Sequence, residues 1–417
     1  MKLRIDNFAL IKHAEIDIDG ITVIAGNNNS GKSTVGKVLY SLFNALNNLD
    51  EKIREQREEQ LTEAVRYSFF EMARDERLFN RFSIIAYIVR RVLNDVADGE
   101  IGWESIFTSI GEKFDLELSA EIKDKLQKEV EVVCTWPKER LLRYSLQASF
   151  QGVFNGQINS LYQTADEAKI DLFIKDTLTS ITFQQNEILH YSSDISLANK
   201  AIYYSSPLAI DVIGARTISD VPMRNLCRLL INYEDAITDD QNLFAQSMQQ
   251  GKLEGVIKKI KSVIPGQVVR SGPKYSLQLP NCSEPINFKN LSSGIKAFMV
   301  LKMLIEANII KRRDVLILDE PEIHLHPTWQ LIYAELIVLL QKEFDLSVVI
   351  TTHSHFFLNA IETYCRKYAT SDKLNLYLAE VEGSGAIIRN VSDASEQIYK
   401  KMAKAVDTLT SERLDYE

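Results

Sequence analysis

The chain begins with alternating apolar and polar positions. The alternation runs through residues 2–8 and 14–24 and predicts two strands, the second broken at Asp19-Gly20. A glycine- and asparagine-rich segment follows, and residues 33–43 after it are expected to form a helix. The start of the chain therefore has the order strand, polar loop, helix.

The second half of the chain contains a different kind of apolar run. Residues 315–318 are entirely apolar and residues 347–351 nearly so, which is typical of strands buried on both faces. An apolar segment precedes each of them, at 297–308 and at 329–340, and predicts a helix. Buried strands that alternate with helices favour a parallel sheet with helices on both faces.

The segments between these regions have mixed patterns. Residues 49–146 have helical spacing, and their first part is densely charged. Residues 216–263 are also expected to be helical, whereas 267–279 and 374–392 each predict a hairpin and 394–409 a final helix. A β-type pattern is expected in four segments between the two helical regions: 146–154, 168–176, 180–193 and 200–214.

The composition, with 45% hydrophobic and 25% charged residues, is ordinary for a soluble globular protein. The net charge of −9 argues against a protein that coats nucleic acid with its whole surface, although it is compatible with a local basic patch. The cysteines are far apart and are expected to be free thiols in a reducing compartment. No signal-peptide pattern and no apolar run of membrane-spanning length occurs, so a cytoplasmic location without membrane contact is expected.

The segment between the first strands and the first helix fits the pattern G-x-x-x-x-G-K-[S/T], in the strand–loop–helix context that this pattern needs. Its glycines let the backbone bend round a polyphosphate, so that N–H groups and the helix N-terminus point at negative charge. Lys32 is expected to reach the β- and γ-phosphates, and the Ser33 hydroxyl to bind Mg²⁺. The residues expected to bind the nucleotide are Gly26, Asn27, Asn28, Asn29, Ser30, Gly31, Lys32, Ser33 and Thr34.

Two carboxylates end the apolar run 315–318. A strand buried on both faces delivers its carboxyl-terminal residues to the edge of the sheet where ligands bind. Asp319 is expected to hold Mg²⁺ there, usually through water, and Glu320 to polarise the water that attacks the γ-phosphate. Together with the phosphate loop, the acidic pair predicts a nucleoside-triphosphatase site.

Two further segments could complete this site. Residues 290–296 lie at the entry to a helix; Ser292 can cap that helix, and Gly294 leaves room for the close approach of an anion. The alternative for this segment is a plain helix cap. His353 follows the strand 347–351 at the same sheet edge and could hydrogen-bond the γ-phosphate region, although a lone histidine is more often structural.

The motifs GNNNSGKS, LSSG, VLILDEPEIHLHP and TTHS, in this order, resemble those of the ABC-type ATPase heads of the SMC, RecF and OLD (overcoming lysogenisation defect) proteins. The resemblance covers residues 1–45 and 265–360. It implies an α/β fold, an ABC-type P-loop ATPase head with an N-terminal antiparallel β subdomain, a RecA-like mostly parallel sheet and a helical insertion.

The same resemblance implies a role for each motif. Lys32 and Ser33 would belong to Walker A, Ser292 to Gly294 to the signature motif, Asp319 and Glu320 to Walker B, and His353 would be the switch histidine. The implied parts of the chain are 1–48 with Walker A, the helical insertion 49–146, a mixed part 147–264 leading to the signature side, and 265–417 with the signature, Walker B and the switch histidine.

Relatives also carry a glutamine that contacts Mg²⁺ and the attacking water, and Gln157 is the first candidate for it, with Gln151 next. Glu322, His324 and His326 occupy the place of a dimer-contact loop in related ATPases. The i, i+2 spacing of the two histidines would suit a metal only with a third ligand nearby, so a metal site there is not expected.

The chain departs from the family in two places. Ile295 stands where many relatives carry Glu or Gln. OLD nucleases also carry a Toprim domain, which needs a Glu after a strand and a later Asp-x-Asp. Glu380 and Glu382 follow a strand, but no Asp-x-Asp comes after them, so the nuclease is expected to be absent.

In this class the signature motif of one subunit closes over nucleotide held by the other. The expected function is therefore a slow, regulated ATPase (ATP and water to ADP and phosphate) that forms a head-to-tail homodimer around ATP and Mg²⁺. It would act as a sensor or scaffold for a separate effector, such as a nuclease, in prokaryotic antiphage defence, because it resembles the single-protein ATPases of Septu-type and PARIS-type systems.

Two alternatives stay open. One is a RecF-like clamp that binds DNA or RNA and acts in repair, although basic surface clusters are more often merely solvated. The other is a non-hydrolysing assembly protein in which ATP is structural. A transporter subunit is disfavoured, because the segment between Lys32 and Leu291 is too long. The candidate phosphate contacts of the clamp are Lys258, Lys259, Lys261, Lys311, Arg312 and Arg313.

Overall fold

The computed structural model divides the chain into two units, Met1–Asn44 with Ser149–Glu417, which we call the sheet unit, and Ala45–Ala148, the helical unit. The structure describes residues 1–403 and 412, apart from 71–80, 99–100, 115–117, 161–164, 194–196, 216, 232, 234–236, 238–254 and 272–273.

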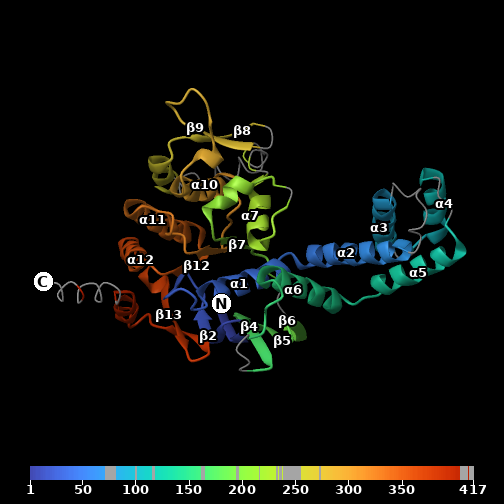
Figure 1. The fold of residues 1–417 in the computed structure, drawn as a ribbon, viewed down its shortest axis with the longest axis horizontal. Coiled ribbons are helices and arrows are strands. Elements are labelled where there is room, and N and C mark those ends of the chain that lie inside the picture. The colour runs from blue at the N-terminus through green and yellow to red at the C-terminus, as the bar shows by residue number, and fades with distance from the viewer. Residues whose placement is uncertain are drawn as a thin grey trace. The chain divides into compact units, whose positions relative to one another are not determined.

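The sheet unit is built around an eleven-stranded sheet in the order β6-β5-β4-β1-β2-β14-β13-β3-β12-β11-β7 (Figure 1). One end of it is antiparallel. Its strands are β1 (Lys2–Phe8), β2 (Ile11–Asp17), β4 (Glu167–Ile174), β5 (Thr177–Gln184) and β6 (Glu187–Ser193).

The other end of the sheet is parallel. Its strands are β13 (Leu374–Glu382), β3 (Ile21–Gly26), β12 (Ser347–Thr352), β11 (Val315–Asp319) and β7 (Ala201–Tyr204). Strand β14 (Gly385–Asn390) joins the two ends, since it pairs antiparallel with β13 and parallel with β2. The predicted α/β fold, with a parallel sheet and an antiparallel N-terminal part, is confirmed.

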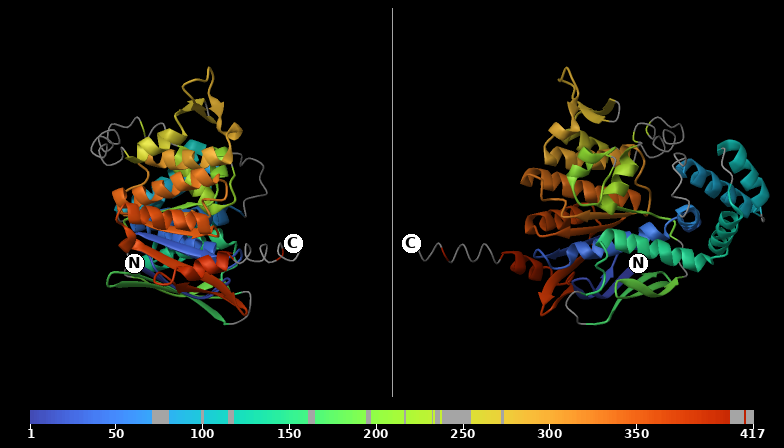
Figure 2. Two further views of the ribbon diagram at one scale, coloured as in Figure 1. Left: turned by 90° about the vertical axis from the view of Figure 1, so that its left-hand side faces the viewer. Right: turned by 45° about the vertical axis from the view of Figure 1, so that its right-hand side comes forward.

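Alternate residues of the parallel strands face different helices. Leu316 and Leu318 belong to the main core cluster with α10 (Ser293–Glu306), α11 (Pro327–Phe344) and α12 (His355–Lys367). Ile317, between them, faces α1 (Lys32–Leu46), because a Cβ on Gly36 would lie 2.8 Å from its Cγ2. Helices α10 to α12 accordingly lie on one side of these strands and α1 on the other (Figures 1 and 2).

Three of the expected elements differ from those observed. The predicted second strand is two strands, because the chain turns at Asp19-Gly20 and Gly20 has φ +59°. Residues 146–154, expected to be β-type, form the end of helix α6 (Lys138–Phe154). Residues 207–212 form the 3₁₀ helix η1 (Pro207–Val212), which begins at a proline after the Ser206 cap.

The error at 146–154 has a physical reason. The buried side chains of α6 include Leu146, Phe150 and Val153, whose spacing is helical. Short apolar runs fit a strand and a buried helix equally well, and here the helix begins upstream at Lys138.

The helical unit has its own apolar core, with fully buried Leu61, Ile88, Ile106 and Leu126 at its centre. This unit agrees with the helical spacing of residues 49–146. Its helices are α2 (Leu49–Phe70), α3 (Arg81–Asp98), α4 (Trp103–Phe114), α5 (Ala120–Cys134) and the first part of α6.

The remaining elements belong to the sheet unit. The predicted hairpin 267–279 is confirmed, since β8 (Gln267–Ser271) and β9 (Lys274–Gln278) pair antiparallel beside β10 (Ile286–Asn287). The other elements are α7 (Val221–Ile231), η2 (Phe288–Asn290) and η3 (Ser371–Lys373).

The helices predicted at 216–263 and 394–409 lie partly outside the described residues. Within them, 221–231, 255–263 and 396–403 are helical. None of the described helices has the length and apolar character needed to cross a membrane.

Candidate functional site

The phosphate loop lies between β3 and α1. Two of its residues have a left-handed backbone, Asn29 with φ +59° and Gly31 with φ +81°, which is a conformation that glycine and asparagine adopt at low cost. Gly26 is required for another reason, because a Cβ there would lie 2.4 Å from the carbonyl oxygen of Ala379 on β13. Local backbone geometry therefore explains the glycines of the motif.

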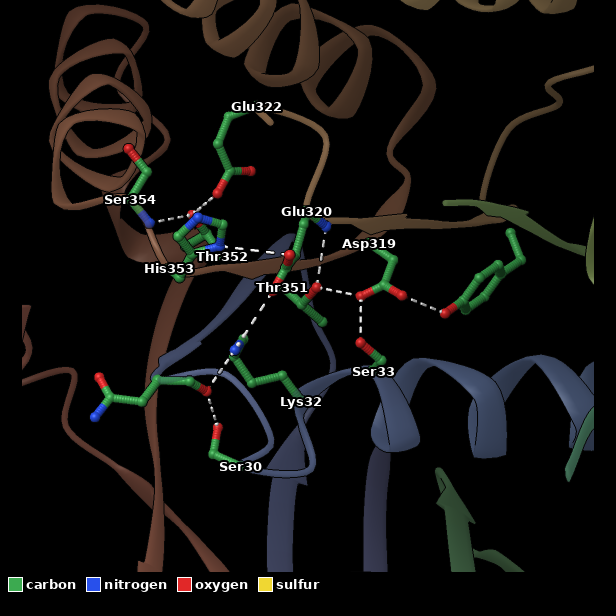
Figure 3. A network of polar contacts seen from close by, with 12 residues as sticks. Ser30, Lys32, Ser33, Asp319, Glu320, Glu322, Thr351, Thr352, His353 and Ser354 are labelled. Atoms are coloured by element: carbon green, nitrogen blue, oxygen red, sulfur yellow. Dashed lines mark hydrogen bonds and ion pairs between the residues drawn. The ribbon is translucent and has the colours of Figure 1, made fainter. Parts of the chain in front are cut away.

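Hydrogen bonds hold the loop in a closed turn. The Ser30 hydroxyl and the Lys32 ammonium both donate to the carbonyl oxygen of Asn27, at 2.8 and 2.7 Å (Figure 3). Lys32 is buried, with its Nζ directed along the inside of the loop. The loop thus places a positive charge where the phosphates of a nucleotide would bind.

Asp319, at the end of β11, collects three hydroxyl donors. The Ser33 hydroxyl donates to its Oδ1 at 2.8 Å, and so does the Thr351 hydroxyl at 2.5 Å. The Tyr203 hydroxyl donates to its Oδ2 at 2.7 Å. The structure therefore brings together the Ser33 and Asp319 side chains that the sequence motifs had assigned to one Mg²⁺ (Figure 3).

Tyr203 is a member of this site that the sequence analysis missed. It lies on β7, its side chain is almost fully buried, and burial raises its pKa well above the usual value, with the Asp319 carboxylate adding to the effect. The hydroxyl therefore keeps its proton and donates a hydrogen bond to Asp319. No sequence motif marks a tyrosine on β7, since its role follows from strand order.

Glu320 has a left-handed backbone conformation, and its carboxylate lies between the side chains of Lys32 and His353. Its φ is +50°, and its N–H donates to the Thr351 carbonyl and hydroxyl oxygens, both at 3.1 Å. Its Oε1 lies 3.5 Å from Lys32 Nζ and its Oε2 lies 3.4 Å from His353 Nδ1. A left-handed glutamate costs on the order of 1–3 kcal/mol, and such strain clusters at functional sites.

A cavity of about 550 Å³ opens beside these groups. Gln157 lines it, as does Ser205 directly after β7, whereas Gln151 instead donates to Glu187 at 3.0 Å. The residues that line the cavity are Ala9, Leu10, Asn28, Asn29, Ser30, Gly31, Lys32, Ser33, Thr34, Gln157, Ser205, Asp319, Glu320 and Ile323.

The segment Ser292 to Gly294 is not among the described residues that line this cavity. Ser292 is exposed and caps α10, its hydroxyl accepting from the Ile295 N–H at 3.4 Å. Gly294 is buried, and a Cβ on it would lie 2.8 Å from the ring of Trp329. Packing against Trp329 therefore also requires a glycine at position 294, in addition to the expected approach of an anion.

Several other candidate residues have structural partners. Lys259 pairs with Glu335, and Arg312 and Arg313 lie 4.0 and 3.4 Å from Asp345. No group of three or more His, Cys, Asp or Glu side chains able to hold a metal occurs in the described part of the chain, including the neighbourhood of His324 and His326. The predicted free thiols are confirmed at Cys134, Cys227, Cys282 and Cys365.

Comparison with solved structures finds SMC heads. The SMC head domain of Thermotoga maritima matches with 13% identity and a TM-score of 0.41, over 94% of this chain and 98% of that chain. An SMC head bound to the C-terminal winged-helix domain of ScpA matches with 11% identity and a TM-score of 0.45, over 95% and 98%. An SMC head with an extended coiled coil, bound to the C-terminal domain of ScpA from Pyrococcus furiosus, matches with 12% identity and a TM-score of 0.39, over 99% and 98%.

A protein-family model described as an AAA ATPase domain matches residues 1–358. The match spans the phosphate loop, the buried strands and the acidic pair that the structure assembles at one sheet edge. The chain belongs to this family of ATPase domains.

Proposed function

We propose that the protein binds ATP with Mg²⁺ and hydrolyses it to ADP and phosphate. The observation that carries this proposal is the convergence of Lys32, Ser33, Asp319, Glu320 and His353 on one end of the phosphate loop. Nucleotide binding alone does not require a carboxylate between the loop lysine and a histidine. Hydrolysis does, because a base must face the attacking water.

The oxygen atoms of Ser33 and Asp319 suit Mg²⁺, which prefers hard oxygen ligands. They would hold the ion at the phosphates together with water. Gln157 lines the same cavity and would contact that water. Bound there, Mg²⁺ would neutralise charge that develops on the transferred phosphoryl group.

The other side chains act on the phosphates and on water. Lys32 would bind the β- and γ-phosphates, and Glu320 would orient and polarise the attacking water. His353 would hydrogen-bond the γ-phosphate. Its side chain is 41% exposed, and its Nδ1 lies 3.4 Å from Glu320 Oε2.

The site is proposed to be completed by a second copy of the chain. The signature residues Ser292 to Gly294 stand outside the lining of the cavity among the described residues, so they would serve the nucleotide of a partner. The capped N-terminus of α10 would then point its positive dipole at the partner's γ-phosphate. ATP adds a contact that ADP lacks, so a head-to-tail dimer would close with ATP and open after hydrolysis.

We further propose that this cycle drives a separate effector. The support is the resemblance to single-protein ATPases of antiphage systems, which suggests a sensor or scaffold for a nuclease in prokaryotic defence. The helical unit has an apolar core of its own and would be the part of the chain that binds such a partner.

The first test compares the wild type with Glu320→Gln. We expect measurable ATP turnover by the wild type and a fall of at least about a hundredfold in kcat for the variant, because the amide cannot act as a base. Affinity for ATP, measured with a fluorescent analogue, should stay within about twofold, since Lys32 and the loop are unchanged. Turnover by Glu320→Gln at the wild-type rate would contradict the assigned base.

The same samples separate the alternatives. A wild type that binds ATP without turnover would support a structural nucleotide. Steeply salt-dependent affinity for DNA or RNA, or turnover stimulated by either, would support the clamp. A second polypeptide that co-purifies stoichiometrically with Glu320→Gln in ATP would support the sensor.

A further inference from the structure

A buried carboxylic acid lies next to the proposed catalytic site. Glu322 is 2% exposed, and its Oε1 accepts a hydrogen bond from the Thr352 hydroxyl. Its Oε2 is buried and has no hydrogen-bond partner among the described residues. Burial raises the pKa of Glu322, with the Thr352 hydrogen bond opposing the effect. An apolar side chain would avoid this cost, so the acid points to a role beyond packing.

The Thr352 hydroxyl connects Glu322 to the turn after β12. It donates to Glu322 Oε1 and accepts from the Ser354 N–H at 3.0 Å. The Ser354 hydroxyl in turn accepts from the Phe357 N–H at 3.2 Å and caps α12. Glu322 therefore holds one end of this turn, while the capped helix holds the other (Figure 3).

His353 lies inside this anchored turn. Its Nδ1 is 3.4 Å from Glu320 Oε2, while 41% of its side chain is exposed. A side chain that is so exposed has few packing contacts to fix its direction. The backbone at positions 352 to 354 must therefore set where the ring points.

We propose that Glu322 is a positioning residue, which holds the 352–354 turn through Thr352 so that His353 faces Glu320 and the γ-phosphate. The part that concerns the γ-phosphate rests on the proposed function. The placement of His353 against Glu320 does not depend on it.

The kinetic test uses two disruptive and two conservative variants. Glu322→Ala and Thr352→Val remove the hydrogen bond, and kcat should fall about ten- to a hundredfold, since a small misplacement of a catalytic group has effects of this size. KM for ATP should change less than about threefold, because Lys32 and the loop still bind the phosphates. Glu322→Gln and Thr352→Ser keep the acceptor and the hydroxyl, and should retain most of the wild-type rate.

A double-mutant comparison shows whether Glu322 acts through His353. In a His353→Ala background, Glu322→Ala should cause no further loss of kcat, because the group that it positions is already absent. Additive losses would overturn the proposal, and so would wild-type turnover by Glu322→Ala. Thr352→Val has nearly the wild-type shape, so it provides the same comparison if Glu322→Ala does not fold.

A structural measurement keeps this inference apart from the proposed function. Crystal structures of the wild type and of Thr352→Val should show the His353–Glu320 contact in the first and its loss in the second, with a displaced 352–354 turn. A turn that stays in place in the variant would overturn the positioning role even in a protein without ATP turnover. Absence of turnover in the wild type would instead overturn the proposed function alone.

Discussion

At the residue scale, the site depends on hydroxyl groups as much as on carboxylates. Asp319 accepts from Ser33, Thr351 and Tyr203, so hydrogen bonds orient both of its carboxylate oxygens. Neighbours of this kind orient a metal ligand and tune its affinity. Ser33 and Thr351 belong to the sequence motifs GNNNSGKS and TTHS, whereas Tyr203 lies outside them.

Tyr203→Phe removes the donor to Asp319 Oδ2 and leaves the ring in place. We expect the Mg²⁺ concentration that gives half-maximal ATP turnover to rise roughly tenfold, because Asp319 loses part of its orientation. Titration of Mg²⁺ at fixed ATP measures the effect. Tyr204→Phe is the matched control, since that buried hydroxyl has no hydrogen-bond partner among the described residues. An equal rise in both variants would contradict a specific role of Tyr203.

At the scale of elements, one buried glutamate joins three helices. Glu335 on α11 pairs with Lys259 in the helix 255–263, and it accepts from Lys367 at 2.7 Å and from Tyr368 at 2.5 Å at the end of α12. This pairing gives Lys259 a structural role.

The Glu335 cluster predicts acid sensitivity. Burial alone would raise the pKa of Glu335, but hydrogen bonds from Lys259, Lys367 and Tyr368 outweigh it and lower the pKa below the usual value. Because the pKa of Glu335 is lower in the folded than in the unfolded state, its carboxylate stabilises the fold at pH values above the unfolded-state pKa, which is near 4.3. This stabilisation is lost as the pH falls through the folded-state pKa. The melting temperature of the wild type should therefore fall steeply below about pH 4.

Substitution tests this assignment. Glu335→Gln should destabilise the protein by about 3 kcal/mol at pH 7 and make the acid-side slope of the melting temperature shallower. Glu343→Gln, on the same helix, is the control for loss of a carboxylate. A Glu335→Gln protein with the wild-type slope would show that other groups cause the acid sensitivity.

At the scale of the whole molecule, the proposed dimer makes each site depend on two chains. Ser292→Asp keeps a good helix cap but places a negative charge against the partner's γ-phosphate, so this variant alone should be inactive. Ser292→Asn caps equally well without the charge, and it should lose much less activity.

Mixing two inactive variants tests the composite site. In an equal mixture of Ser292→Asp and Glu320→Gln, half of the dimers contain one of each, and each of these has one intact site. Turnover should therefore recover to about a quarter of the wild-type value per chain. No recovery, in a mixture that forms ATP-dependent dimers, would mean that each chain completes its own site.

The local features of this protein could be predicted from its sequence alone. The phosphate loop follows its strand and precedes its helix within a few residues, so its pattern was sufficient to predict the nucleotide site. The buried strand ending in Asp319 and Glu320 was also readable, because a continuous apolar run before two carboxylates is typical of a sheet edge.

Contacts between residues far apart in the chain depend on the fold and could not be predicted from the sequence. Ser33 and Asp319 are 286 positions apart, and Tyr203 reaches Asp319 across 116 positions, because the order of strands in the sheet sets these contacts. The same dependence made residues 146–154 ambiguous, since a short apolar segment becomes helix or strand according to what it packs against. The turn around His353 likewise depends on Glu322, which belongs to another loop.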